Sequence, residues 1–306
     1  MIEKYEKAGK LCSEIRGEAV ELIKDGLPII DLVEFVEGET LKRGGGIAFP
    51  CNVSVNEIAA HYTSPLGDTN CLHAGDLVKL DLGVHIDGFI SDSAITVMVP
   101  GDDLESHVGE DYLDVNYDLI DASRAGLDAA LSTVRAGVEL GAIGSAVEGA
   151  IRGAGFNPIA NLAGHQLDEY VLHSGVSVPN VGDKNTHTVE EGDVLAIEPF
   201  ATTGDGVVTD TPQVYIYKFM RKRPFRMVHT KRVLNNVIKE YPYLPFSKRW
   251  LCGDFDEHRL NTSLLQLSQA MAIYAYPALR ERTGEWVSQA EHTVIVESDG
   301  CKIISE

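Results

Sequence analysis

Two aspartates lie within an otherwise apolar, strand-like stretch, KLDLGVHIDGFISDSA, which spans residues 79–94. If Asp87 and Gly88 form the two-residue turn of a hairpin, residue i pairs with residue 175−i. Asp81 and Asp92 then share a face as diagonal neighbours, because strand side chains alternate between faces. Carboxylates this close repel each other, and one takes up a proton unless a cation binds there. Alone, the pair fits a hairpin with solvated acids better than a metal site.

A second pair of acids follows in an equivalent setting. The segment GDLVKLD, which ends at Asp81, aligns with GDVLAIE, which ends at Glu198. Likewise, DSAITV begins at Asp92 and resembles EHTVIV, which begins at Glu291. Four carboxylates together with one or two histidines suit a two-metal site with hard ligands. The repetition therefore favours the metal site over the solvated hairpin.

The elements that must position these acids also occur twice. Residues 4–24 have the apolar spacing of a helix, Gly26 can end it, and IIDLVEFVEGETLK predicts a second helix. The stretch 120–152 resembles 9–41 and places Gly137 on Gly26. We expect two α/β half-domains related by a pseudo-twofold axis, which would bring the four acids to the centre.

The two halves differ in the spacing between their acids. The first pair is 11 residues apart and the second is 93 apart. This difference predicts an inserted helical module over about 206–282, within a catalytic domain made of 1–205 and 283–306. The periodicity of LLQLSQAMAIYAY, residues 264–276, predicts a helix inside the module.

Composition narrows the class of protein. The chain has 306 residues, 44% hydrophobic residues and a net charge of −20, which argues against nucleic-acid or anionic-membrane binding over the whole surface. No stretch approaches the roughly 18 apolar residues of a membrane span, and the charged start MIEKYEKAGK lacks a signal core. Five widely spaced cysteines without a C-x-x-C pair are typical of a reducing compartment. We therefore expect a cytoplasmic protein.

One basic stretch stands out against this acidic background. KFMRKRPFRMVHTKR, residues 218–232, carries seven Lys or Arg and no acid. A solvated face of the insertion is the simpler interpretation. The alternative is a surface that contacts the ribosome or RNA.

Five motifs occur in the order AAHYTSP, LDLGVHIDGFISDSA, NLAGHQLDEYVLHSG, VLAIEPF and QAEHTVIV. Over about residues 1–300 they resemble the motifs of methionine aminopeptidase, type II. The long gap before Glu291 is similar to the helical insertion of type II, and the N-terminal extension of eukaryotic members is absent, as in the compact archaeal-like form. The resemblance implies the α/β (α+β) pita-bread fold, two pseudo-twofold related halves around a dinuclear metal site with an inserted winged-helix-like subdomain.

The resemblance also implies a set of metal ligands, at Asp81, Asp92, His165, Glu198 and Glu291. Asp81 would bind one ion, and His165 and Glu198 the other. Asp92 and Glu291 would bridge the two. The ions would be divalent Co, Mn, Fe or Zn, and the residues do not decide among them.

Further roles follow from the same resemblance. His61 and His173 would contact the substrate around the scissile amide, although nothing else in the sequence selects these histidines. Glu198 would transfer protons, and Phe49 and Leu172 would line a methionine pocket. The implied reaction is removal of the N-terminal methionine from peptides and nascent chains with a small second residue, by a metal-bridging water or hydroxide. We expect a monomer.

Two alternative functions remain open. A non-catalytic homologue that associates with ribosomes or RNA would use 218–232, but retention of all five ligand positions opposes a loss of catalysis. An Xaa-Pro peptidase or a creatine amidinohydrolase could share the fold. Those relatives usually carry a further N-terminal domain, and only about 60 residues precede His61.

Overall fold

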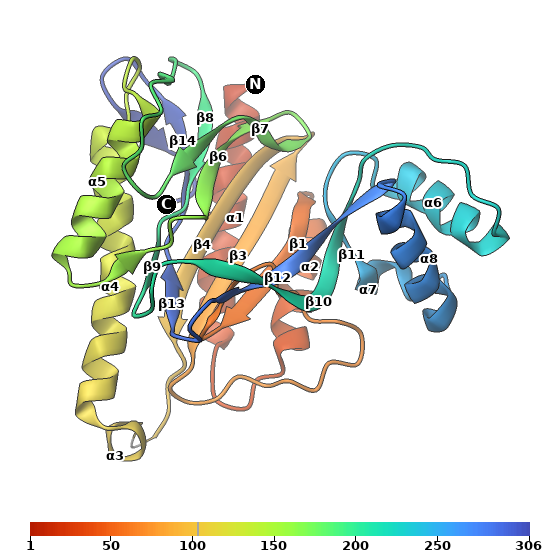
Figure 1. The fold of residues 1–306 in the computed structure, drawn as a ribbon, viewed down its shortest axis with the longest axis horizontal. Coiled ribbons are helices and arrows are strands. Elements are labelled where there is room, and N and C mark those ends of the chain that lie inside the picture. Colours follow the sequence, from red (N-terminus) through yellow and green to blue (C-terminus); the bar gives the residue numbers. More distant parts are fainter. Residues whose placement is uncertain (103) are drawn as a thin grey trace.

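A computed structural model describes residues 1–102 and 104–306 of the chain as a mixed α/β structure (Figure 1). Its first half contains a three-stranded antiparallel sheet in the order β1-β3-β4, with α1 against β3 and β4 and α2 against β1. The elements of this half are α1 (Ile2–Leu22), α2 (Ile29–Lys42), β1 (Gly46–Val55), β2 (Ile58–Ala60), β3 (Leu77–Ile86) and β4 (Phe89–Met98).

The second half repeats the arrangement of two helices on a sheet. Its five-stranded sheet has the order β15-β14-β8-β6-β7, and a smaller sheet has the order β13-β9-β5. The elements are α3 (Leu104–Val108), α4 (Glu110–Thr133), α5 (Leu140–Gly153), β5 (Asn157–Pro158), β6 (Ala163–Asp168), β7 (Val171–Pro179), β8 (Val194–Ile197), β9 (Phe200–Thr202), β13 (Val287–Gln289), β14 (His292–Val296) and β15 (Cys301–Ile303). Among the described residues, no helix is both long and apolar enough to cross a membrane.

The predicted helical repeat is confirmed. Helix α5 begins and ends 111 residues after α2, which is the offset found in the sequence. Gly26 and Gly137 precede these two helices with φ values of 76° and 83°. Such positive φ values suit glycine, because a Cβ atom would clash there.

The predicted hairpin is also confirmed. Asp81 pairs with Ala94 and Gly83 pairs with Asp92, as the 175−i rule requires. Asp87 and Gly88 have φ values of 51° and 90°, the backbone of a type I′ turn. The two aspartates therefore lie on one face of the β3–β4 hairpin.

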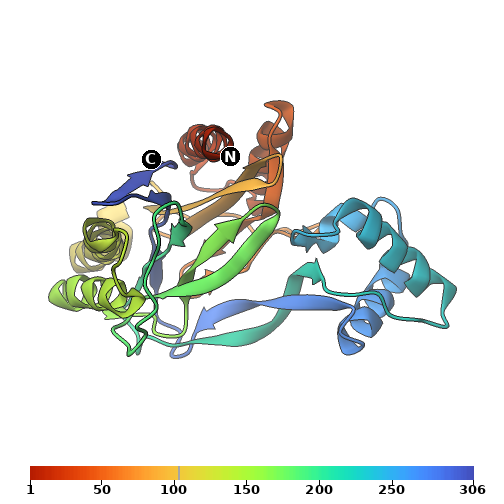
Figure 2. The ribbon, with the colours of Figure 1, turned by 90° about the horizontal axis from the view of Figure 1, so that it is seen from above.

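A two-stranded arm projects from the body and carries a helical unit at its far end (Figures 1 and 2). Strands β10 and β12 pair along the arm, and the helices pack around a core of their own. The elements are β10 (Val208–Phe219), α6 (Val228–Glu240), β11 (Phe246–Ser247), α7 (Lys248–Leu251), α8 (Glu257–Gln269) and β12 (Ile273–Glu281).

The helix predicted over residues 264–276 is wrong in its second part. Helix α8 ends at Gln269, Met271 adopts a φ of 54°, and Ile273 already belongs to β12. The backbone from Ile273 onward pairs with β10, so a partner distant in sequence overrides the local helical spacing.

A buried ion pair fastens the helical unit to the body. Arg249 Nη2 lies 2.8 Å from both carboxylate oxygens of Glu37 on α2, and Trp250 Nε1 donates to the same carboxylate at 2.8 Å. The Arg249 and Glu37 side chains are only 9% and 8% exposed. The arm and this ion pair therefore both hold the unit against the body.

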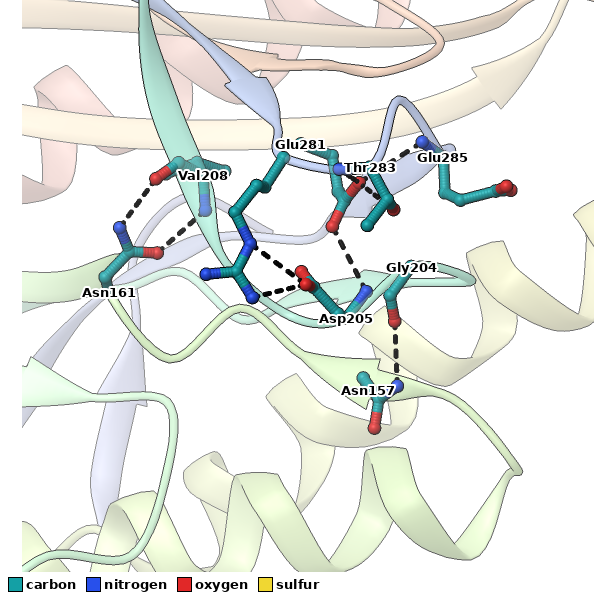
Figure 3. Close-up of polar contacts among 9 residues, drawn as sticks. Asn157, Asn161, Gly204, Asp205, Val208, Glu281, Thr283 and Glu285 are labelled. Carbon is teal, nitrogen blue, oxygen red and sulfur yellow. Dashed lines mark hydrogen bonds and ion pairs between the residues drawn. The ribbon is translucent and has the colours of Figure 1, made fainter.

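The base of the arm is fixed by a second polar cluster (Figure 3). The Glu281 carboxylate has no exposed surface and accepts from the backbone N–H groups of Asp205 at 3.1 Å and Thr283 at 2.6 Å. The Asn161 amide donates to Val208 O at 2.8 Å and accepts from Val208 N at 2.9 Å. These bonds fix where both arm strands leave the body.

Candidate metal centre

One cavity, of about 810 Å³ including its open mouth, lies where the two halves and the arm meet. Every site residue predicted from the sequence lines it, namely Phe49, His61, Asp81, Asp92, His165, Leu172, His173, Glu198 and Glu291. The acids and His165 come from β3, β4, β6 and the segments next to β8 and β14. Residues that are up to 242 positions apart in the chain, from Phe49 to Glu291, therefore share one site.

Hydrogen bonds between the two halves place the acids of one half against those of the other. Thr293 Oγ1 donates to Asp92 O at 2.7 Å and accepts from Asp92 N at 2.8 Å. Glu291 N donates to Ala94 O at 3.0 Å. Since β4 and β14 are joined directly beside Asp92 and Glu291, the acid positions are set by the main chain of both halves.

The donor atoms fit a metal ion. Asp92, His165 and Glu291 each offer one ligand atom, and these atoms lie within 4.8 Å of one another. His165 Nε2 is 3.9 Å from Glu198 Oε1. Buried oxygens Asp81 Oδ1 and Asp92 Oδ1 have no hydrogen-bond partner, which is costly unless a cation binds there. Carboxylates with one imidazole are a ligand set for divalent transition metals.

The electrostatics of the four acids also favour a bound cation. Burial raises the pKa of Asp81 to about 7. Burial, then the neighbouring carboxylates, raise the pKa values of Asp92, Glu198 and Glu291 well above their usual range. Within residues 1–102 and 104–306, no Lys or Arg forms an ion pair with any of the four. A divalent cation would remove this repulsion.

The histidines of the cavity are held in the neutral form. Burial lowers the pKa of His61 and, together with His173, that of His165 well below its usual value. Desolvation, then the Lys218 ammonium, lower the pKa of His173, which remains exposed toward the mouth. A neutral imidazole has one N–H donor and one acceptor nitrogen, so each can donate to an oxygen or bind a metal.

His61 has an unusual backbone. Its φ is 64°, which is uncommon for a residue other than glycine. Its ring packs edge-on against Tyr276 of β12, with 5.4 Å between the centroids. The arm therefore fixes the orientation of this imidazole at one wall of the cavity.

Two basic residues next to the site, the buried Lys79 and the half-buried Arg16, were missed in the sequence. Lys79 has no exposed surface, and its Nζ donates to Asn56 O and Val287 O, each at 2.8 Å. Burial lowers the pKa of Lys79 to about 7. Arg16 of α1 contacts the Ser93 hydroxyl, which donates to Glu291 O at 3.0 Å. The only sequence signal was a lysine between apolar strand residues.

Some of the cavity wall was missed too. Asn52 faces Asp81 across the β1–β3 ladder, is buried, and lines the cavity. Ile216 of β10 and Tyr276 of β12 contribute from the arm, and Pro245 from the helical unit. No spacing in the sequence brings the insertion back onto the site, because that depends on how the arm is oriented.

A family model and a relative of known name indicate the same kind of protein. A family model, "Metallopeptidase family M24", matches residues 3–233. A protein named methionine aminopeptidase from Methanothermobacter thermautotrophicus is 55% identical over 306 residues, which cover 100% of this chain and 99% of that protein.

Solved structures share the fold at lower identity. A thermophilic Arx1 superposes with a TM-score of 0.85 at 19% identity, covering 99% of this chain and 89% of that chain. A methionine aminopeptidase from Thermotoga maritima gives a TM-score of 0.69 at 22% identity, covering 100% and 96%. These two structures support the pita-bread architecture.

Proposed function

This chain belongs to metallopeptidase family M24, and we propose that it removes the N-terminal methionine of peptides and nascent proteins by metal-dependent hydrolysis. One observation carries the proposal. Four carboxylates and three neutral histidines converge in a cavity that also has an apolar wall. The full-length similarity to a methionine aminopeptidase supports the same reaction.

We propose that the site binds two divalent ions. Asp81, Asp92, His165, Glu198 and Glu291 would hold them. Three of these residues already offer ligand atoms within 4.8 Å of one another. When bound, divalent metals polarise the substrate carbonyl and activate water near neutral pH.

Side chains of the protein would perform the proton transfers and hydrogen bonding of the reaction. The Glu198 carboxylate, whose pKa burial raises, would accept a proton from the attacking water and give it to the leaving amine nitrogen. The neutral His173 would donate its N–H to the oxygen of the tetrahedral intermediate. His61 would hydrogen-bond beside the scissile nitrogen, in the orientation that Tyr276 fixes.

The apolar wall would select methionine. Phe49 and Leu172 lie in one buried cluster and both line the cavity. A long, flexible thioether side chain suits such a pocket. We propose that the second substrate residue must be small.

Peptide cleavage tests the function. The metal-loaded enzyme should release methionine from Met-Ala-Ser and much less from Met-Ile-Ser. Glu198→Gln should lose nearly all turnover, while Glu190→Gln, which changes an exposed acid, should retain it. Cleavage of Ala-Pro peptides instead would indicate an Xaa-Pro peptidase, and no cleavage by the metal-loaded enzyme would contradict the proposal.

The surroundings of the site suggest where the enzyme works. We propose that the helical module of 206–282 contacts the ribosome through residues 218–232, and that the protein acts in the cytoplasm as a monomer. Arg221, Lys222, Arg223 and Arg226 of this stretch are exposed. All five cysteines are free, which suits a reducing compartment.

Co-sedimentation with ribosomes tests this docking. Replacing the four exposed basic residues by Glu should abolish co-sedimentation and leave Met-Ala-Ser cleavage intact. Binding of the unmodified protein should also weaken steeply with salt. Equal co-sedimentation of the two proteins would contradict the docking surface.

A further inference from the structure

Strands β10 and β12 of the arm run from the body toward the helical unit (Figure 2). Ile216 and Tyr276 pair across β10 and β12, and both line the cavity. The pair two residues farther along is Lys218 with Tyr274. Since residues two apart in a strand share a face, this next pair extends the cavity wall outward.

On β12, aromatic rings form a continuous row that begins at His61. The Tyr274 and Tyr276 rings pack edge-on with 4.7 Å between centroids, and Tyr276 packs on His61 in the same way. Tyr274 is 51% exposed. A chain that leaves the cavity past His61 therefore meets one tyrosine and then the other.

On β10, the facing residue is Lys218, a cation without an ionic partner among the described residues. Lys218 is half-buried, and in the described part of the chain it has neither an ion pair nor a side-chain hydrogen bond. Its positive charge lies close enough to the cavity to disfavour protonation of His173. A half-buried ammonium that lacks a carboxylate within the protein is able to accept one from a ligand.

The direction of the substrate follows from the proposed function, on which this inference rests. With methionine against Phe49 and Leu172 and the scissile amide beside His61, the rest of the peptide must continue past Tyr276 onto the arm. An extended chain advances about 3.4 Å per residue, as do the arm strands. The two-residue step from Ile216 to Lys218 thus matches the step from the substrate methionine to substrate residue 3.

We propose that Lys218 and Tyr274 form a subsite for the third residue of the substrate and favour an acidic side chain there. The Lys218 ammonium would pair with the Asp or Glu carboxylate, and the Tyr274 ring would pack on the substrate backbone. The bonds of Glu281 and Asn161 at the base of the arm hold this subsite in place relative to the metal centre (Figure 3).

Overall electrostatics predict the opposite preference. A protein with a net charge of −20 repels acidic peptides at long range. A preference for an acid at residue 3 would therefore require a local cation. Two peptides of identical composition separate the local effect from the overall one, because they differ only in where the acid lies.

The experiment compares kcat/KM for Met-Ala-Asp-Ser-Ser-Ser-amide and Met-Ala-Ser-Ser-Ser-Asp-amide, using the metal-loaded full chain. We expect the first to be favoured by about threefold to tenfold, a difference of up to about 1.4 kcal/mol. Lys218→Met should bring the ratio to about one, Lys218→Glu should invert it, and Lys218→Arg should keep it. Lys239→Met removes an exposed charge from α6 and should leave the ratio unchanged.

Each result has a defined meaning. Because the ratio is measured within each variant, it does not depend on how much of that variant folds. A ratio near one in the unmodified enzyme, or a preference that persists in Lys218→Met, would overturn the subsite. If neither peptide nor Met-Ala-Ser is cleaved, the proposed function fails and the subsite fails with it.

Discussion

The four carboxylates of the cavity should make metal binding depend on pH. Protons and metal compete for them, and burial raises the pKa of Asp81 to about 7. Metal affinity should therefore rise between pH 6 and pH 8, by up to about tenfold per pH unit for each proton displaced. Calorimetric titration with Mn(II) at both pH values measures this, and the same affinity at each would contradict it.

The metal-free protein should show the opposite trend in stability. Asp81 binds a proton more tightly in the folded state, so the free energy of unfolding falls as pH rises from about 4 through about 7. Asp81→Asn removes this contribution, and its stability should vary less over that range. Urea unfolding of both proteins without metal provides the comparison, and identical pH profiles would argue against a raised pKa.

His61 offers a test of the proposed hydrogen bond to the substrate. His61→Asn keeps a residue that tolerates a φ of 64°, but it moves the donor away from the scissile nitrogen. We expect kcat to fall roughly 10- to 100-fold, the value of a hydrogen bond of about 1.5–3 kcal/mol. His61→Gly checks the backbone separately, and an unchanged kcat in both variants would remove His61 from catalysis.

Single residues differed in how far the sequence could predict them. Asp81 and Asp92 could be placed on one face from a turn and a period of two. Pairing Glu198 and Glu291 with them needed the internal repeat. The histidines needed a family resemblance, because an isolated histidine has no periodicity. Lys79 was missed because its partners are backbone carbonyls, which no sequence pattern reveals.

At the scale of elements, the contact between α2 and the helical unit depends on one buried ion pair. Removing Glu37 would replace this buried ion pair by the longer contact of Arg249 with the exposed Glu34, and breaking a buried pair costs about 3–5 kcal/mol. Glu37→Ala should lower the free energy of unfolding by about that amount. Glu34→Ala is the matched control, since Glu34 is 58% exposed and lies 3.8 Å from Arg249 Nη1.

Chemical denaturation of the two variants distinguishes them. We expect a large loss for Glu37→Ala and less than about 1 kcal/mol for Glu34→Ala, because exposed ion pairs contribute little. Equal losses in both variants would show that the pair does not fasten the unit.

There is a physical reason why some helices could be predicted from the sequence and the stretch 264–276 could not. Helices α2 and α5 could be predicted because each has apolar residues along one face and a glycine shortly before its first residue. The stretch 264–276 was predicted as a helix although its second part is a strand. That part pairs with residues of β10 that lie 54 to 60 positions earlier in the chain, and local spacing carries no information about such a partner.

At the scale of the whole molecule, the site lies on the seam between two similar halves. Asp81 and Asp92 come from the first half, and His165, Glu198 and Glu291 come from the second. A bound metal would therefore link the halves. The two-half architecture could be predicted from the repeat, but the path of the arm back to the cavity could not, because it depends on contacts of Glu281 and Asn161 with remote backbone.

The central claim is that this cavity cleaves N-terminal methionine with the help of bound metal. The most direct test is methionine release from Met-Ala-Ser by protein stripped with a chelator and then titrated with Co(II) or Mn(II). We predict no release from the stripped protein and a saturating recovery as metal is added. Release that is unaffected by stripping, or none at any metal concentration, would contradict the account.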